Sequence, residues 1–142
     1  MSHNRAGEES FLTTSLGRTG IKVSRIGLAG THRPGRQPLA SSIDQGVNLF
    51  FFFGFDTHMI KMLKEALPGN RDRIVVATGI YNFILGYPNP RRTLEKRLRH
   101  LGTDYIDLFL FLGVLSPKHF TDELMEELIR FREEGKFRAI GL

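Results

Sequence analysis

Three side chains that can exchange protons follow two apolar segments of the sequence. Asp56 and His58 come directly after the phenylalanine run 50–53, and Tyr81 follows the apolar run 74–78. If both runs are parallel strands, the loops after them lie at one end of the sheet, where a His–Asp pair beside a phenol could carry out acid–base chemistry. The simpler interpretation, which we favour, is a helix cap, a surface histidine in the first helical turn and a loop aromatic.

The other reactive groups are too scattered to indicate a site. The five histidines form no His-x-x-x-His or His-Glu-x-x-His pattern, so the sequence gives little support to a metal site. The absence of cysteine excludes disulfides, thiolate metal sites and a cysteine nucleophile. Ser41 and Ser42 lack the Gly-x-Ser-x-Gly context of a hydrolase nucleophile. The glycines of segment 27–30 fit neither the dinucleotide-binding nor the phosphate-loop spacing.

The chain is basic, which favours anionic partners. Its 142 residues include 20 Lys and Arg against 15 Asp and Glu, a formal charge of +5. Much of the excess lies in segment 91–100, which is typical of the solvated side of an amphipathic helix. Because no aromatic residues alternate with these bases, nucleic acid is not the expected partner, and an anionic partner of another kind is kept as an alternative.

Strands and helices that would position these side chains alternate along the sequence. The turn at 17–20 lies between two short alternating runs and predicts a β-hairpin. The runs 47–53 and 74–78 are apolar on both faces, as in strands buried on both sides. Alternating strands and helices predict a parallel α/β sheet, either an open sheet or part of a barrel. Strands are expected at residues 25–28, 47–53, 74–78, 106–114 and 137–140, and helices at 39–45, from a cap at 56 or 57 to 67, at 90–101 and from a cap at 121 to 134.

The two helices nearest the C-terminus carry the clearest boundary signals. Asn89 followed by Pro90 predicts a capped helix start, and Gly102 predicts its end. Thr121 is the expected cap of the last helix. In the first of the two helices, the spacing of the leucines at 94, 98 and 101 predicts the face that packs on the sheet.

The division of the chain is expected to be simple. Residues 1–12 are polar and are predicted to be a disordered leader, and residues 13–142 are predicted to be one domain. The N-terminus has no signal-peptide pattern and no segment is apolar enough to span a membrane, so the predicted location is the cytoplasm.

Several segments, in order, resemble the aldo-keto reductase family, whose members are NADP-linked (β/α)₈ barrels. Residues 16–28 resemble the opening hairpin and first strand, and 43–48 the end of the first helix. Residues 73–78 resemble the third strand, 94–108 are the most specific match, and 128–142 resemble the fourth helix and fifth strand. The resemblance implies a partial TIM-barrel-like parallel sheet of about five strands behind an N-terminal β-hairpin, truncated after the fifth strand.

The resemblance also assigns positions to the family's catalytic tetrad of Asp, Tyr, Lys and His. Counting from the matching segments places these roles at Phe51, Asp56, Gly79 and Leu112, respectively, so none of the four keeps the group that its role needs. The tripeptide 55–57 resembles the family's Phe-Asp-Thr, which would restore the aspartate. The loop after it is too short for the tyrosine, and we interpret Asp56 as a helix cap or a loop acid.

Strand alternation predicts what the barrel mouth would present. Phe51, Gly79 and Leu112 should face the interior, while Phe50 and Phe52 face the helices. The mouth would then be apolar, with a gap in place of the lysine and no proton donor near neutral pH.

Cofactor binding is expected to be incomplete. Gly30 and Thr31, in the loop after the first strand, resemble a cofactor-proximal element of the family. The family's Ser-Asn pair and most of its phosphate contacts follow later strands, beyond Leu142. The resemblance implies NADP(H), but no cofactor is expected to bind this chain alone, and no metal is expected.

Three functional hypotheses follow. The first is a truncated aldo-keto-reductase-like domain without reductase activity of its own, which would be a pseudoenzyme, a binding module or a fragment. The second is part of an NADP(H)-dependent oxidoreductase completed by a partner chain or a longer product. The third is a basic surface that binds an anionic partner. Open sheet edges also predict a homo-oligomer or a completing partner.

Overall fold

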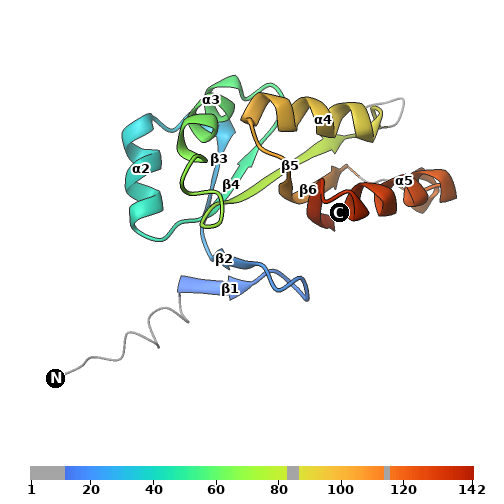
Figure 1. The fold of residues 1–142 in the computed structure, drawn as a ribbon, viewed down its shortest axis with the longest axis horizontal. Coiled ribbons are helices and arrows are strands. Elements are labelled where there is room, and N and C mark those ends of the chain that lie inside the picture. Colours follow the sequence, from blue (N-terminus) through green and yellow to red (C-terminus); the bar gives the residue numbers. More distant parts are fainter. Residues whose placement is uncertain (1–11, 83–86, 114–115) are drawn as a thin grey trace.

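The computed structural model describes residues 12–82, 87–113 and 116–142. They form an antiparallel hairpin and a five-stranded parallel sheet in which the strand order follows the sequence, β3-β4-β5-β6-β7 (Figure 1). The strands are β1 Thr13–Ser15, β2 Lys22–Ser24, β3 Gly27–Ala29, β4 Leu49–Phe52, β5 Val75–Tyr81, β6 Ile106–Leu112 and β7 Phe137–Gly141. The helices are α2 Arg36–Asp44, α3 Thr57–Ala66, α4 Pro90–Leu101 and α5 Asp122–Glu133, with 3₁₀ turns η1 Gly30–His32 and η2 Pro117–His119. The predicted hairpin and five-stranded parallel sheet are confirmed.

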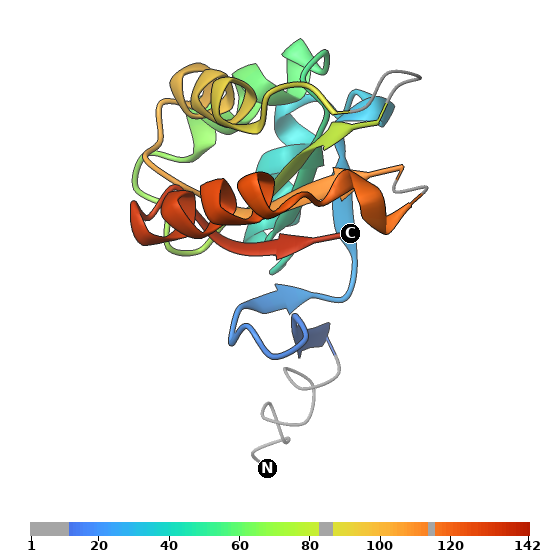
Figure 2. The same ribbon diagram turned by 90° about the vertical axis from the view of Figure 1, so that its right-hand side faces the viewer.

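The two faces of the sheet are covered by different elements (Figure 2). On one face, Phe50, Phe52, Phe109 and Phe111 are fully buried in a core that includes residues from all four helices. On the other face the hairpin supplies the cover, since its buried valine and isoleucine pack on strand residues; this second core consists of Ile21, Val23, Val75 and Ala139. The alternation predicted for β4 is therefore confirmed.

Asn48 fastens the hairpin to the sheet. Its side-chain Oδ1 accepts a hydrogen bond from the Ser24 N–H at 2.7 Å, and its Nδ2 donates to the Lys22 carbonyl at 3.0 Å. The Asn48 backbone N–H donates to the Ser24 hydroxyl at 3.0 Å. These three hydrogen bonds hold β2 against Asn48, the residue directly before β4.

The prediction that strand 47–53 is buried on both faces was wrong for the face that the helices do not cover. Leu49 and Phe51 are only half-buried, whereas Phe50 and Phe52 are fully buried. The reason is the reach of the hairpin, which packs on Leu49 near the start of the strand. Phe51, Leu110 and Leu112 lie further along their strands, are partly exposed and belong to neither core.

Helix α4 begins and ends where the sequence predicts. The Asn89 side chain accepts a hydrogen bond from the Arg92 N–H at 2.8 Å, and Gly102 adopts the left-handed conformation with φ 68°. Thr121 caps α5 in the same way, accepting from the Leu124 N–H at 3.3 Å. The leucines at 94, 98 and 101 are buried against the sheet, as their spacing predicts.

Two boundaries differ from the predictions by three residues, and the others by two or fewer. Helix α2 begins at Arg36 rather than at 39, because Pro38 falls within its first turn, where no N–H donor is needed. Strand β5 continues to Tyr81, which was expected to lie in a loop, because Tyr81 still pairs with Leu112 of β6. Strand β6 ends at Leu112, and the predicted end at Val114 lies outside the described residues. The predicted leader, residues 1–12, also lies outside them apart from Leu12.

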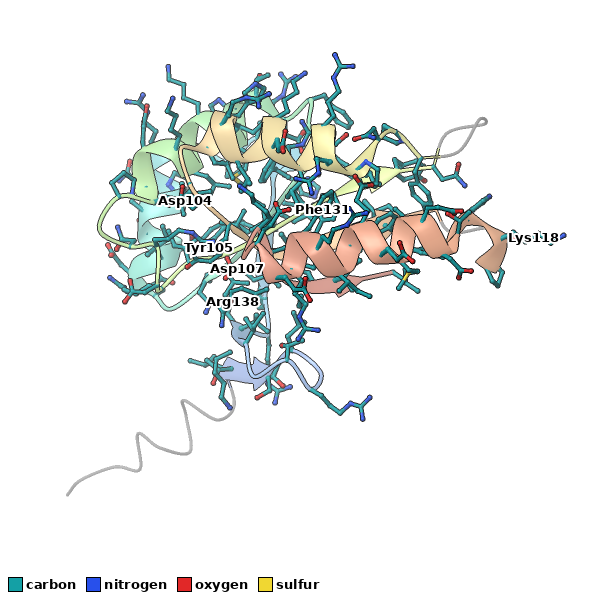
Figure 3. The ribbon with its side chains drawn as sticks, turned by 45° about the vertical axis from the view of Figure 1, so that its right-hand side comes forward. Asp104, Tyr105, Asp107, Lys118, Phe131 and Arg138 are labelled. Carbon is teal, nitrogen blue, oxygen red and sulfur yellow. The ribbon has the colours of Figure 1, made fainter. Side chains whose placement is uncertain are left out.

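The buried Asp107 carboxylate connects the first residues of three strands through hydrogen bonds and ion pairs. Asp107, which is 1% exposed, accepts from Arg71 at 2.8 Å, from Arg138 at 2.9 Å and from the Val76 N–H at 2.9 Å. Figure 3 shows Asp107 and Arg138 beside Tyr105, over whose ring the Arg71 guanidinium lies at 3.6 Å. This network joins β5, β6 and β7 at the end opposite the predicted mouth.

Candidate functional site

The carboxyl ends of the parallel strands form the region where the sequence places catalytic groups. Phe51 of β4 pairs with Ala77 of β5, and Gly79 lies two residues further along β5, opposite Leu110. Leu112 lies two residues beyond Leu110 on β6. The stagger places Phe51, Gly79 and Leu112 on one diagonal across the face that the helices do not cover.

These three positions give the mouth an apolar surface. Phe51 meets the ring of Phe53 edge to face, with centroids 4.8 Å apart, and Phe53 in turn stacks on Phe55 at 5.2 Å. Gly79 is buried, and Leu112 is half-buried. None of these side chains can donate or accept a proton, so the diagonal itself offers hydrophobic contact and no acid–base chemistry.

Asp56 is committed to a backbone bond. Its Oδ2 accepts a hydrogen bond from the Phe53 N–H at 2.7 Å, which closes the turn between β4 and α3. Asp56 is the N-cap residue of α3, as predicted, but its side chain makes no hydrogen bond to the N–H groups of the helix. The alternative prediction, a loop acid, describes its role.

A cavity of about 600 Å³ brings Asp56 together with the two candidate cofactor residues. Gly30 and Thr31 line it along with Arg33 and His58. A Cβ atom on Gly30 would lie 2.9 Å from the Asp56 carboxylate oxygen, so the glycine permits the close approach of these two segments. The spacing of η1 and α3 therefore depends on Gly30.

The acid–base group considered from the sequence is not assembled. His58 and Asp56 line the same cavity, but the His58 Nε2–H donates to the Pro34 carbonyl at 3.0 Å and Asp56 binds the Phe53 N–H. Within the described residues no hydrogen bond joins the two side chains. Tyr81 lies elsewhere, in the lining of a separate cleft against α4.

That separate cleft is the feature that sequence reasoning missed. It has a volume of about 620 Å³ and brings Phe53 and Phe55 to the same space as Arg92, Lys96 and Arg97 of α4. The one signal in the sequence was Gly54 between two phenylalanines, because an isolated glycine beside a strand often marks a close approach of another group.

The apolar diagonal at the mouth offers no group that would bind a nicotinamide dinucleotide. Gly30 is packed against Asp56 and Met59, and the neighbouring diagonal presents Phe51 and Leu112, which offer no donors to a carboxamide or a phosphate. In the described ranges no group of three or more His, Asp or Glu side chains could hold a metal ion, and no helix there is long and apolar enough to cross a membrane.

The curated proteins similar to this chain include several that are named aldo-keto reductases. Aldo-keto reductase YhdN of Bacillus subtilis is 33% identical over 156 residues, which cover 91% of this chain and 46% of that protein. Morphine 6-dehydrogenase of Pseudomonas putida is 27% identical over 87% of this chain and 43% of its own length. No family model matches the sequence. The chain spans about half the length of the curated relatives that cover most of it.

Solved structures give the same result. A Pseudomonas aeruginosa protein assigned to the aldo-keto reductases aligns with a TM-score of 0.75 and 26% identity, over 92% of this chain and 58% of that one. An aldo-keto reductase of Klebsiella pneumoniae in complex with NADPH aligns with a TM-score of 0.67 and 27% identity, over 86% of this chain and 46% of that one. The parallel sheet is thus the part of a TIM barrel that the resemblance implied, and the chain is related to the aldo-keto reductases over nearly all of its own length and about half of theirs.

Proposed function

We propose that this chain is a binding module related to the aldo-keto reductases and that it does not reduce carbonyl compounds by itself. The observation that supports the proposal is the chemistry of the mouth. Three of the four positions assigned to the tetrad, Phe51, Gly79 and Leu112, carry no ionisable group, and the fourth, Asp56, is bonded to the Phe53 N–H. Carbonyl reduction needs a proton donor beside the hydride donor, and these positions supply none.

The test is a direct assay of the purified chain. NADPH and a reactive aldehyde are mixed with the protein, and the loss of NADPH absorbance is followed, with a related aldo-keto reductase as the positive control. We expect the rate to equal that of the buffer, and a fluorescence titration with NADPH alone to give no saturable change. Turnover above the buffer rate that scales with protein concentration would contradict the proposal.

A second candidate is favoured by the uncovered face of the sheet. Phe51, Leu110 and Leu112 are half-buried there, beyond the reach of the hairpin, and an apolar surface of this kind is suited to another protein surface. In this case the chain would be part of an NADP(H)-dependent oxidoreductase completed by another chain or by a longer product. Recovery of NADPH-dependent turnover when a separate chain carrying the remaining part of a related barrel is added would favour this candidate over the first.

A further inference from the structure

The cleft between the β4–α3 loop, the end of β5 and helix α4 combines aromatic and cationic side chains. Figure 1 shows α4 running beside β5. From the helix, Arg92, Lys96 and Arg97 line the cleft, and from the loop, Phe53 and Phe55 line it. Positions 92 and 96 are one turn apart on a helix, so their charges point to the same side. No acidic side chain is among the described residues that line this space.

Arg97 is the least compensated of these cations. Its Nε is buried, and no hydrogen-bond acceptor in the described part of the chain reaches it. Burial lowers the pKa of the Arg97 guanidinium from its ordinary value, because loss of water disfavours the charged form. Arg91 on the same helix is a contrast, since it lies within ion-pair distance of Glu95 and Glu134.

Gly54 provides the space that the Arg97 guanidinium occupies. A Cβ atom built on Gly54 would overlap the guanidinium nitrogens and their central carbon. Any other residue at this position would therefore push the Arg97 head group out of its place. The glycine in the β4–α3 loop therefore leaves room for the cation at this place in the cleft.

The chemistry of the lining indicates the kind of ligand. An unpaired, partly buried guanidinium is costly, and an oxyanion that accepts its N–H groups removes that cost. Three cations around one space favour a doubly charged group over a single carboxylate. Phe55 is 72% exposed while its ring stacks on Phe53, so one face of an aromatic pair is open for a further ring.

We propose that this cleft binds a phosphate monoester of a compound with a planar ring. The phosphate is held by Arg97 with Arg92 and Lys96, and the ring lies against Phe55. Gly79, the position that the resemblance assigns to the family's lysine, also lines this cleft, so the proposed site borders the mouth. The proposal does not depend on whether the chain reduces carbonyl compounds, because phosphate binding needs no proton donor.

The experiment is a calorimetric titration of the whole chain with phenyl phosphate, compared with inorganic phosphate and with phenol. We expect saturable binding of phenyl phosphate with one site per chain, weaker binding of inorganic phosphate and none of phenol. Failure of phenyl phosphate to bind would overturn the proposal. Equal affinity for phenyl phosphate and inorganic phosphate would also overturn it, because the ring contact would then contribute nothing.

Variants separate the built site from the general positive charge of the protein. Arg97→Gln should weaken phenyl phosphate binding by about tenfold or more, as expected for a hydrogen bond between charged groups. Gly54→Ala keeps every charge but displaces the guanidinium, and should weaken binding several-fold; circular dichroism verifies that this variant is folded. The matched control is Arg99→Gln, which removes one exposed charge from the same helix outside the cleft and should change affinity less than twofold. Equal losses in Arg97→Gln and Arg99→Gln would mean non-specific attraction and would overturn the proposal.

Discussion

At the scale of single residues, Asp107 is the group on which the largest effect is expected. Its carboxylate is buried and is bonded to two arginines and to the Val76 N–H. Replacing it leaves Arg71, whose side chain is 19% exposed, without its anion. Breaking such a buried pair costs about 3–5 kcal/mol.

We therefore expect Asp107→Ala to lower the free energy of unfolding by about 3–5 kcal/mol, measured by urea denaturation. The control is Glu65→Ala, which removes the exposed partner of Arg36 at 2.8 Å and should cost no more than about 1 kcal/mol. A loss in Asp107→Ala no larger than that of the control would show that the carboxylate is not stabilising.

The residues of the candidate site were predictable to different degrees. Phe51 and Leu112 could be placed on one face of the sheet because side chains alternate strictly along a strand. The bond from the Phe53 N–H to Asp56 could not be foreseen, because it depends on the exact turn between β4 and α3. The position of the Arg97 side chain also could not be predicted, because a long side chain on a helix can point toward solvent as easily as toward a neighbouring loop.

At the scale of elements, an ion pair connects α4 to the end of α5. Arg91 donates two hydrogen bonds to Glu134, at 3.0 and 3.2 Å, and its guanidinium lies 4.2 Å from the ring centre of Phe131. The hydrogen bond from Arg91 lowers the pKa of Glu134 below its ordinary 4.5. A carboxylate whose pKa is depressed by folding stabilises the native state above its unfolded pKa, and that contribution is lost as the pH falls through its folded pKa.

Glu134→Gln tests this linkage. We expect the variant to be slightly less stable than the original chain at neutral pH, because the pair is exposed, and the difference to disappear as the pH falls below 4.5. Urea midpoints of the two proteins measured across that range give the comparison. Glu133→Gln, a neighbouring charge outside this pair, should produce no such pH-dependent difference; the same profile in both variants would contradict the assignment.

The elements themselves followed from local signals, with informative exceptions. The caps at Asn89 and Thr121 were read correctly because each depends on a few adjacent residues. The end of β5 was predicted incorrectly, because its last pairing, Tyr81 with Leu112, is a contact between distant parts of the chain. Local patterns predict where an element can begin, whereas the neighbouring strand decides how far it extends.

At the scale of the whole molecule, we expect the uncovered part of the sheet to determine whether chains associate in solution. Leu110 and Leu112 are half-buried on that face, and β3 and β7 each have one side without a partner strand in the described residues. Unpaired edges and exposed apolar strands favour association between chains. The mass of the isolated chain should therefore rise with concentration.

Sedimentation velocity over a concentration series measures this directly. We expect species larger than the monomer, and we expect Leu110→Lys to reduce them, because a charge on the uncovered face makes its burial between chains unfavourable. Lys61→Leu, which removes an exposed charge from the opposite side on α3, should not reduce them. A single monomeric species at every concentration would mean that the face is closed in solution.

The close contact at Gly79 limits which residues this position can accept. A Cβ atom there would overlap the carbonyl oxygen of Leu110, so β5 and β6 lie too close together for any side chain at this position. The resemblance gives the family's lysine this place. In this sheet a lysine at position 79 would meet the neighbouring backbone, so Gly79→Lys alone should not place an amine at the mouth. The two strands would first have to move apart, and the substitution should therefore lower the free energy of unfolding.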